Sequence, residues 1–118
     1  SPDEYISVFR LVYSSLGSAG VLLFSGDKKI QYVSPFMEEI TGIRNDSVYG
    51  TDIQSAARDS AFVAFVEDVF SKANPLSMGQ ATREDFEFSG NQYQMESFSI
   101  GSSGVPILYV LTALKKDA

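Results

Sequence analysis

The segment of residues 20–50 constrains the fold most, because its pattern changes abruptly from strand to helix. It begins with the apolar run Val-Leu-Leu-Phe at residues 21–24, continues with the turn-forming Ser-Gly-Asp at residues 25–27, and resumes with Ile-Gln-Tyr-Val at residues 30–33. Two apolar runs separated by Gly and Asp are typical of strands joined by a tight turn. The segment therefore predicts a β-hairpin.

A short helix is predicted directly after this hairpin. Ser34 is a suitable N-cap, and Pro35 at the first helical position lacks only a backbone N–H that would have no partner there. Gly42 can adopt the left-handed conformation that commonly ends a helix. The apolar stripe of this helix is predicted to consist of Phe36, Ile40 and Ile43.

Composition limits the classes of protein to which the chain can belong. Its 118 residues suffice for one hydrophobic core, and 44% of them are apolar, close to the globular average of about 45–50%. The net charge of −6 repels nucleic acid and anionic lipid, and no apolar run approaches the ~20 residues that span a bilayer. The acidic N-terminus is unlike a signal peptide. We therefore expect a cytoplasmic domain that contacts neither nucleic acid nor membrane.

The chain contains no cysteine and no histidine. It therefore lacks thiolate nucleophiles and metal ligands, the commonest general base, and the Ser–His and Cys–His pairs of familiar hydrolases and transferases. Carboxylate or Ser–Lys chemistry remains, but the sequence shows no convergent arrangement of these groups. We predict that the domain has no catalytic residues and no metal site. A small enzyme or binding protein that acts alone is the alternative.

Two longer amphipathic helices are predicted to pack against the sheet. The helix of residues 2–16 begins with the capping-box sequence Ser-Pro-Asp-Glu and ends before Gly17. The helix of residues 60–73 is capped by Asp59 or Ser60 and stops at the following Asn-Pro. Their apolar stripes consist of Tyr5, Val8, Phe9, Val12 and Leu16 in the first helix, and of Phe62, Val66, Val69, Phe70 and Ala73 in the second.

The last third of the chain predicts three strands joined by two turns. A turn at Gly90-Asn91 places residues whose numbers sum to 181 opposite one another, which separates an apolar from a charged face. The first face then carries Glu84, Phe86, Phe88, Tyr93, Met95 and Ser97. A second turn at Ser102-Ser103 extends both faces. The first face gains Leu108 and Val110. On the second face, beyond its charged residues, Val105, Ile107, Tyr109 and Leu111 join Phe98 and Ile100 in an apolar band.

The first of these faces is the predicted inner face, covered by the helices of residues 35–42 and 60–73. The space between this face and the helices is either a filled hydrophobic core or a ligand pocket. In a pocket, Glu84 and Ser97 would place polar groups in an otherwise apolar wall. Solvent is the alternative partner of Glu84. The predicted ligand-binding residues are Phe36, Ile40, Phe62, Val66, Glu84, Phe86, Tyr93, Met95, Ser97 and Leu108.

The second face carries an apolar band that needs a cover, because exposed bands of this kind mark interaction surfaces. The matching stripe of residues 2–16 either folds back over its own sheet or pairs with a second copy of the chain. We expect a homodimer. The predicted interface residues are Tyr5, Val8, Phe9, Val12, Phe98, Ile107 and Tyr109.

Acidic residues have structural interpretations as well. Glu38 and Glu39 are adjacent, so their side chains point in different directions on a helix. We expect their negative charges to stabilise the N-terminal end of the helix through its dipole rather than to form an acid–base pair. Asp46, Asp52 and Asp59 are expected in caps and turns, with an oxygen-ligated cation as the alternative.

The sequence Ile-Gln-Tyr-Val-Ser-Pro-Phe-Met-Glu-Glu-Ile-Thr-Gly-Ile at residues 30–43, followed by Tyr-Gly at residues 49–50, resembles the front half of a PAS domain. PAS domains are sensory and dimerisation modules of signalling proteins. The order of the later elements extends the resemblance to about residues 20–114. It implies an α+β fold with a five-stranded antiparallel sheet flanked by helices. The expected divisions are an N-terminal amphipathic helix at 1–17, the PAS-like domain at 18–114 and the start of a linker at 115–118.

The resemblance implies a regulatory sensor domain of a multidomain signal-transduction protein. Such a domain senses a small ligand, mediates dimerisation, or does both, to control an attached histidine kinase, cyclic-dinucleotide enzyme, phosphatase or transcription factor. PAS domains attach flavin or other chromophores through Cys and usually hold haem through His. Since the chain has neither residue, we expect no covalent flavin, no Cys-linked chromophore and no His-ligated haem. The alternative is a structural dimerisation module with a filled core and no ligand.

Overall fold

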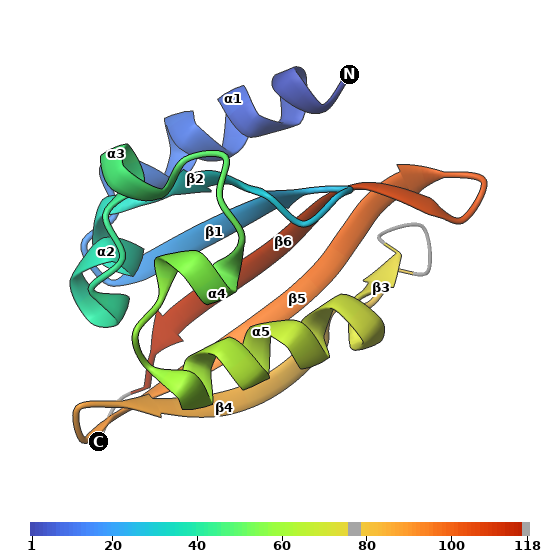
Figure 1. Ribbon diagram of the computed structural model, residues 1–118. Coiled ribbons are helices and arrows are strands. Elements are labelled where there is room, and N and C mark those ends of the chain that lie inside the picture. Colours follow the sequence, from blue (N-terminus) through green and yellow to red (C-terminus); the bar gives the residue numbers. More distant parts are fainter. Residues whose placement is uncertain (76–78, 117–118) are drawn as a thin grey trace.

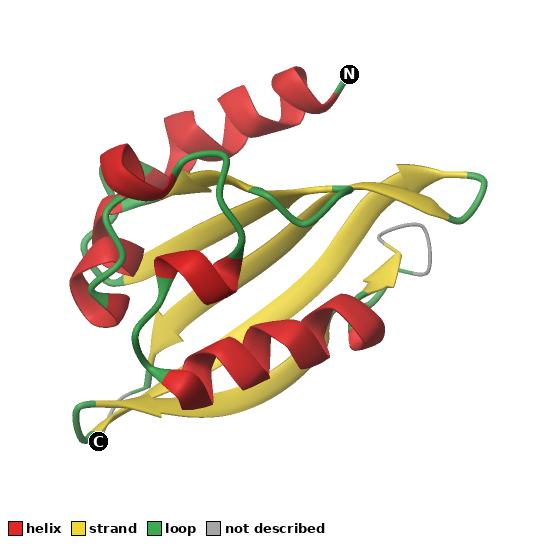
Figure 2. Ribbon diagram, in the orientation of Figure 1, coloured by secondary structure: helices red, strands yellow, loops and turns green. Residues whose placement is uncertain are grey.

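A twisted sheet runs through the centre of the structure, with helices on both of its faces (Figure 1 and Figure 2). The computed structural model describes residues 1–75 and 79–116. Within these residues the sheet has six strands in the order β2, β1, β6, β5, with β4 and β3 both paired to β5. The strands are β1 (Ala19–Ser25), β2 (Ile30–Val33), β3 (Asn74–Pro75), β4 (Thr82–Phe88), β5 (Asn91–Ser102) and β6 (Val105–Lys115).

Five of these strands form the predicted antiparallel sheet, since β1–β2, β1–β6, β4–β5 and β5–β6 all pair in antiparallel fashion. The two-residue β3 is an addition, which pairs in parallel with Phe98 and Ser99 of β5. The predicted α+β class is therefore confirmed. β6 continues to Lys115, and residues 117 and 118 of the predicted linker lie outside the described residues.

One helix covers the outer face of the sheet, and the other helices lie on the inner face (Figure 1). The helices of the described residues are α1 (Pro2–Tyr13), α2 (Pro35–Thr41), α3 (Asn45–Val48), α4 (Ile53–Ala56) and α5 (Ser60–Lys72). α1 ends three residues before the predicted Leu16, because Ser14 and Ser15 follow and serine favours local side-chain bonds over continued helix. Asp59 caps α5, and its carboxylate accepts hydrogen bonds from the amides of Ala61 (2.9 Å) and Phe62 (3.2 Å).

The opening hairpin and helix are found where the sequence predicts them. β1 and β2 pair, α2 begins at Pro35, and Gly42 ends it with a left-handed φ of 77°. The free edge of β2 is closed by the following loop. Ile30 donates a backbone hydrogen bond to Thr51 and accepts one from Gly50, both at 2.8 Å. This edge is therefore paired within the chain.

The β4–β5 hairpin has the predicted faces but a different pairing. The turn is formed by Ser89 and Gly90, whose φ angles of 49° and 82° suit a two-residue turn of the type that strand twist favours. Phe86 consequently pairs with Tyr93 and Glu84 with Met95, two residues away from the predicted partners. Because a displacement of two residues keeps each side chain on its side of the sheet, the prediction of the inner face was correct for this hairpin.

The β5–β6 hairpin has the opposite faces from those predicted. Its turn is formed by Ser103 and Gly104, with φ angles of 55° and 77°, one residue later than expected. A bulge between Ile100 and Gly101 then shifts the register by one more residue. Moving the turn by one residue shifts the pairing by two residues, and the bulge adds one, so the total displacement is three residues. Because this number is odd, every side chain of β6 beyond the bulge changes sides. Tyr109, Leu111 and Ala113 are inner residues, whereas Leu108 and Val110 are outer residues.

Two hydrophobic clusters result from this arrangement. The larger one fills the space between the inner face and helices α2 to α5, and includes Phe24, Phe62 and Met95. The smaller one lies between the outer face and α1, and includes Leu23, Leu108 and Val110. The sheet is therefore buried on both faces where α1 crosses it.

Candidate ligand and dimer sites

The inner face brings together most of the residues that were predicted to bind a ligand. They lie in, or packed against, the larger cluster, and are Phe36, Ile40, Phe62, Val66, Phe86, Tyr93 and Met95. Their elements explain the convergence, because α2 and α5 present apolar stripes to alternate residues of β4 and β5. The structure thus confirms their common location, and their role in ligand binding stays a prediction.

Aromatic rings fill this part of the inner face. Phe88 lies 5.1 Å from Phe62 and 5.8 Å from Tyr93 between ring centroids, and the Tyr93 ring lies 6.1 Å from Phe36. These edge-to-face contacts are the favoured packing of aromatic side chains. None of the ten predicted ligand-binding residues lines any of four cavities, of about 170 to 600 Å³, on the described part of the chain. This arrangement supports a filled core between α2, α5 and the β4–β5 hairpin.

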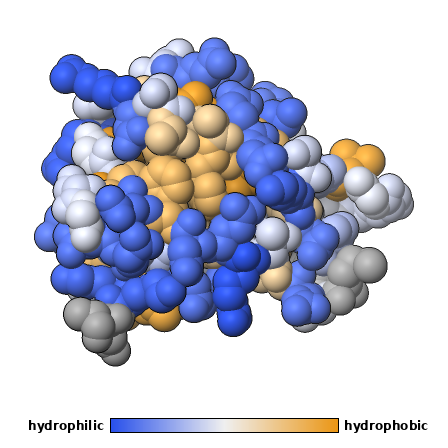
Figure 3. All heavy atoms as spheres, turned by 90° about the horizontal axis from the view of Figure 1, so that it is seen from below, coloured by the Kyte–Doolittle hydropathy of each residue, from blue (hydrophilic) through white to orange (hydrophobic). Residues whose placement is uncertain are grey.

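One side of this core reaches the surface between α5 and β4. Phe65 of α5 and Phe86 of β4 are half-buried, with ring centroids 5.0 Å apart. Figure 3 shows an apolar area framed by hydrophilic residues on the side of the molecule that carries α5 and β4. At this surface the side chains of Phe65 and Phe86, rather than a further helix or strand of the described residues, lie between the aromatic core and solvent.

Glu84 lies at the rim of the inner face rather than within it. Its carboxylate forms an ion pair with Lys72 of α5 at 3.4 Å, and 37% of its side chain is exposed. Lys72 also pairs with Asp68 at 2.7 Å. The hydrogen bond to Asp68 and the charge of Asp68, followed by the charge of Glu84, raise the pKa of the Lys72 ammonium. Glu84 thus links β4 to α5, and its predicted ligand role is not supported by its position.

Ser97 and Leu108, which were both predicted on the inner face, lie on opposite faces of the sheet. Ser97 is buried on the inner face, with Thr82 and Leu111 as its cross-strand neighbours. Leu108 is fully buried in the outer cluster, so its predicted place on the inner face was wrong. The reason is the odd register shift described above. Its neighbour Tyr109 is buried on the inner face instead.

The outer face is covered by α1, through side chains that were only partly predicted. Phe9 packs on this face, with its ring 6.4 Å from that of Phe98, and Ile107 joins the same cluster. Ile6 and Tyr13 also pack there and were missed. The spacing of residues 6, 9 and 13 is helical, so this second stripe could have been found in the sequence. Tyr109 was predicted here incorrectly, since it lies on the opposite face.

The predicted residues Tyr5, Val8 and Val12 form an exposed row along α1. Their exposed fractions are 42%, 59% and 50%. α1 contains no buried residue at all, and a space of about 600 Å³ lies between it, Gln31 and Tyr49. The helix therefore lies on the sheet along one narrow row of contacts.

The surroundings of Tyr13 and Tyr32, at the contact between α1 and the sheet, favour the uncharged form of both side chains. The Arg10 guanidinium lies 5.0 Å from the centroid of the Tyr32 ring, a favourable cation–π arrangement. Burial raises the pKa of Tyr32, an effect that Arg10 opposes and Glu38 reinforces. Burial, with the charge of Glu96, also raises the pKa of Tyr13. Both tyrosines are uncharged at neutral pH, which suits their packing between helix and sheet.

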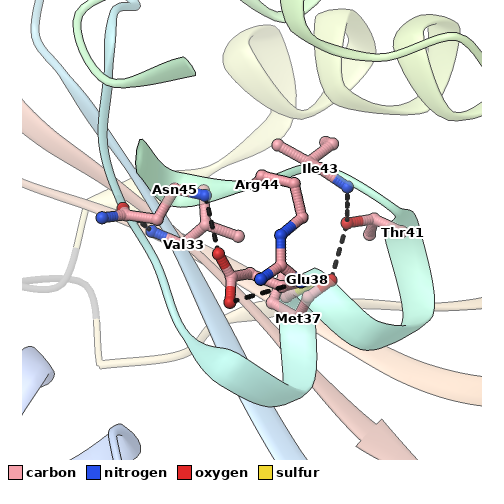
Figure 4. A network of polar contacts seen from close by, with 7 residues as sticks. All are labelled: Val33, Met37, Glu38, Thr41, Ile43, Arg44 and Asn45. Atoms are coloured by element: carbon pink, nitrogen blue, oxygen red, sulfur yellow. Dashed lines mark hydrogen bonds and ion pairs between the residues drawn. The ribbon is translucent and has the colours of Figure 1, made fainter. Parts of the chain in front are cut away.

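A polar network joins α2, α3 and β2 (Figure 4). The Glu38 carboxylate accepts a hydrogen bond from the Asn45 amide at 2.7 Å and lies 3.9 Å from the Arg44 guanidinium. The Asn45 side-chain oxygen accepts a hydrogen bond from the Val33 amide at 2.9 Å. Glu38 therefore connects two helices, a role that helical spacing could not indicate, because its partner Asn45 is the first residue of the next helix, α3.

Of the three aspartates expected in caps and turns, Asp52 and Asp59 cap α4 and α5, whereas Asp46 lies in the first turn of α3, whose N-cap is Arg44. Asp52 accepts a hydrogen bond from the Ser55 amide at 2.9 Å, and this bond lowers the pKa of its carboxyl group. In residues 1–75 and 79–116, no group of three or more His, Cys, Asp or Glu side chains is arranged to hold a metal ion. Among the helices of the same residues, none combines the length and hydropathy needed to span a membrane.

Comparison by sequence and by structure gave different results. No protein-family model and no curated protein matches the sequence. Solved structures do match the fold. A domain of an HTR-like protein from Haloarcula marismortui has 19% identity and a TM-score of 0.63, over 84% of this chain and 98% of that one.

Two further solved structures match the fold of this chain. A sensory box sensor histidine kinase from Vibrio cholerae has 16% identity and a TM-score of 0.65, over 100% of this chain and 99% of the solved one. The PAS domain of the quorum-sensing receptor RpfR from Cronobacter turicensis, solved in complex with BDSF, has 13% identity and a TM-score of 0.56, over 87% and 98%. At these identities the similarity establishes the fold alone. The chain has the fold of a PAS domain.

Proposed function

We propose that this chain is a regulatory sensor domain of a multidomain signal-transduction protein in the cytoplasm. The observation that carries the proposal is the position of α1. This helix contacts the outer face through Ile6, Phe9 and Tyr13, and exposes the separate apolar row of Tyr5, Val8 and Val12. It can therefore be held by its own sheet and by a partner at the same time.

The exposed row fits a second copy of the chain. Val8 and Val12 are four residues apart and Tyr5 and Val8 three, so the row follows one side of the helix. Phe98, whose ring lies 6.4 Å from that of Phe9, and Ile107 are half-buried in the outer cluster and would extend the proposed apolar surface onto the sheet. A homodimer formed by this surface would place two α1 helices together, and a shift in the sheet would change how they meet.

The comparisons support a regulatory rather than a catalytic role. The similar Vibrio cholerae protein is a sensor histidine kinase, and the similar Cronobacter turicensis domain was solved with the small molecule BDSF. We infer that this domain likewise responds to a small ligand and controls an attached effector, with a kinase as the first candidate. The absence of Cys and His from the sequence directs this inference towards a noncovalently bound ligand.

The test is the oligomeric state of the domain and of two charged variants. Sedimentation velocity across a hundredfold range of concentration is expected to show a monomer–dimer equilibrium. The double variant Val8→Glu/Val12→Glu places negative charge in the row and should shift the equilibrium to monomer. Leu11→Glu is the matched control, because Leu11 is 78% exposed on the same helix but lines the space beside Tyr49. A wild-type monomer at all concentrations, or equal loss in the control, would contradict the proposed interface.

The filled aromatic core favours one second candidate, a structural dimerisation module without a ligand. Phe62, Phe88 and Tyr93 occupy the space in which a ligand was predicted. Native mass spectrometry separates the two candidates. A dimer that carries a small-molecule adduct, lost on denaturation, supports the sensor. A dimer without adduct, which also binds none of a panel of small molecules, supports the structural module.

A further inference from the structure

A separate cavity of about 240 Å³ is lined by residues from the C-terminal end of α5, from β3 and from the β5–β6 hairpin. Figure 1 shows these three elements on the same side of the sheet. Tyr93 in the aromatic core and Ser99 in this cavity are six residues apart on β5, about 20 Å along the strand. The cavity is therefore distinct from the site predicted by the sequence. Its lining residues are Phe70, Ala73, Pro75, Ser99, Gly101, Ser103, Gly104, Val105, Pro106 and Tyr109.

The hairpin wall of this cavity has little freedom to move. A Cβ atom at Gly101 would lie 2.0 Å from the Val105 carbonyl oxygen, and one at Gly26 would lie 2.4 Å from that of Pro106. The chain therefore packs backbone against backbone on both sides of Pro106, whose own φ is fixed by its ring. Ser103 and Gly104 close the turn with left-handed φ angles. Such a preformed wall reduces the ordering cost of binding.

The inner part of the cavity combines an aromatic surface with hydroxyl groups. Ser99 and Tyr109 lie directly opposite each other in the β5–β6 register and are only 4% and 8% exposed. The Tyr109 ring meets the edge of Phe70 at a centroid distance of 5.1 Å and an angle of 65°. Phe70 is held in turn by Phe24, at 5.0 Å. Both rings of the cavity are thus fixed from behind.

We propose that this cavity binds a small, uncharged aromatic molecule with one hydrogen-bonding group. The ten lining residues include no charged side chain, which disfavours an ionised ligand that would lose its hydration without compensation. An apolar cavity of about 150 Å³ accepts a benzene ring, so 240 Å³ accommodates a substituted ring or a fused bicyclic one. The hydroxyls of Ser99 and Tyr109 are the groups that would fix its orientation.

The same strand connects this cavity to α1. Tyr109 lines the cavity, and its neighbours Leu108 and Val110 point to the opposite face, where they belong to the cluster that contacts α1. A small shift of strand β6 as a whole upon binding would therefore reach the α1 contacts through Leu108 and Val110. This regulatory consequence rests on the proposed function, whereas the binding itself does not.

The test uses indole as the probe and amide NMR of the whole 118-residue domain as the readout. Indole is expected to give saturable shifts of the amides of Ser99, Gly101 and Tyr109. Indole-3-carboxylate, of similar shape but charged, should bind at least tenfold more weakly. Tyr109→Phe should raise the indole Kd about three- to tenfold, the effect of one lost hydrogen bond. Tyr49→Phe is the matched control, because Tyr49 lies outside the cavity and should leave the Kd unchanged.

Ala73→Leu provides a second variant, which fills the cavity and should abolish the indole shifts while leaving the dispersion of the spectrum intact. The proposal is overturned if indole causes no saturable shift, if shifts centre on Phe62 and Tyr93 instead, or if Ala73→Leu binds as well as the wild type. Saturable shifts at the cavity with no change in the amides of residues 5–13 would support the binding site and refute its coupling to α1. The experiment thus distinguishes a failure of ligand binding at the cavity from a failure of its coupling to α1.

Discussion

The Ser34 hydroxyl oxygen accepts a hydrogen bond from the backbone amide of Val21 at 2.8 Å, and the Ser34 amide donates one to the Val21 carbonyl at 3.0 Å. Ser34 occupies the N-cap position of α2, yet its side chain makes no capping bond. Its hydroxyl and its backbone amide instead both bond to Val21, so the pairing of β1 with β2 continues for one residue beyond the Leu22–Val33 pair. The side chain is fully buried, so no water can take its place.

Ser34→Ala is therefore expected to lower the free energy of unfolding by about 1–3 kcal/mol, because it leaves the buried Val21 amide without an acceptor. Urea unfolding followed by circular dichroism measures this change. Ser71→Ala removes a hydroxyl from the exposed face of α5 and should change the stability by less than about 0.5 kcal/mol. Equal effects of the two substitutions would show that the Ser34–Val21 bond contributes nothing specific.

The attachment of α1 depends on Phe9. Phe9→Ala should cost about 1–2 kcal/mol, because a half-buried ring leaves the outer cluster, and should speed amide hydrogen exchange within residues 2–13. Exchange in β1 and β6 is expected to change much less. Leu11→Ala makes a similar truncation at a 78% exposed position and serves as the control. Uniformly faster exchange across the sheet would mean that α1 is an integral part of the core.

The local elements could be predicted from the sequence because their signals are local. Asp59 caps α5 and Gly42 ends α2, and each does so through contacts with residues two to four positions away. The faces of β6 could not be predicted in this way. Val105 to Leu111 is apolar on both sides of the strand, so alternation gives no preference for either register.

Turn chemistry offered a better signal for β6 than alternation. A two-residue turn with both φ angles positive favours Gly at its second position, which selects Ser103-Gly104 over Ser102-Ser103. The bulge at Ile100 and Gly101 accompanies a close approach of Gly101 to the Val105 carbonyl, a tertiary contact that local sequence signals do not reveal. The cavity beside Tyr109 follows from this bulge and turn, and so it was missed together with them.

Asp52 predicts an acid-dependent contribution to stability. Its hydrogen bond to the Ser55 amide lowers the folded-state pKa of the carboxyl group below its ordinary value of 3.8. The contribution is therefore fully present above pH 3.8 and is lost as the pH falls through the folded-state pKa. Asn is an equally good N-cap without a charge, so Asp52→Asn isolates this effect. The difference in stability between wild type and variant should be constant from pH 5 to 8 and change only below about pH 4. A difference that varies between pH 5 and 8 would assign it to another group.

Glu38 gives the sharpest test of a role that sequence spacing left open. Its carboxylate accepts the Asn45 amide hydrogen bond at 2.7 Å (Figure 4). Only 18% of the Glu38 side chain is exposed, whereas the adjacent Glu39 is exposed. Glu38→Ala should lower the free energy of unfolding by about 1–2 kcal/mol and speed hydrogen exchange at Asn45. Glu39→Ala removes the same charge from the same helix and should do neither. If both substitutions have the same effect, the two residues act only through the helix dipole; if Glu38→Ala alone is destabilising, Glu38 holds α3 against α2.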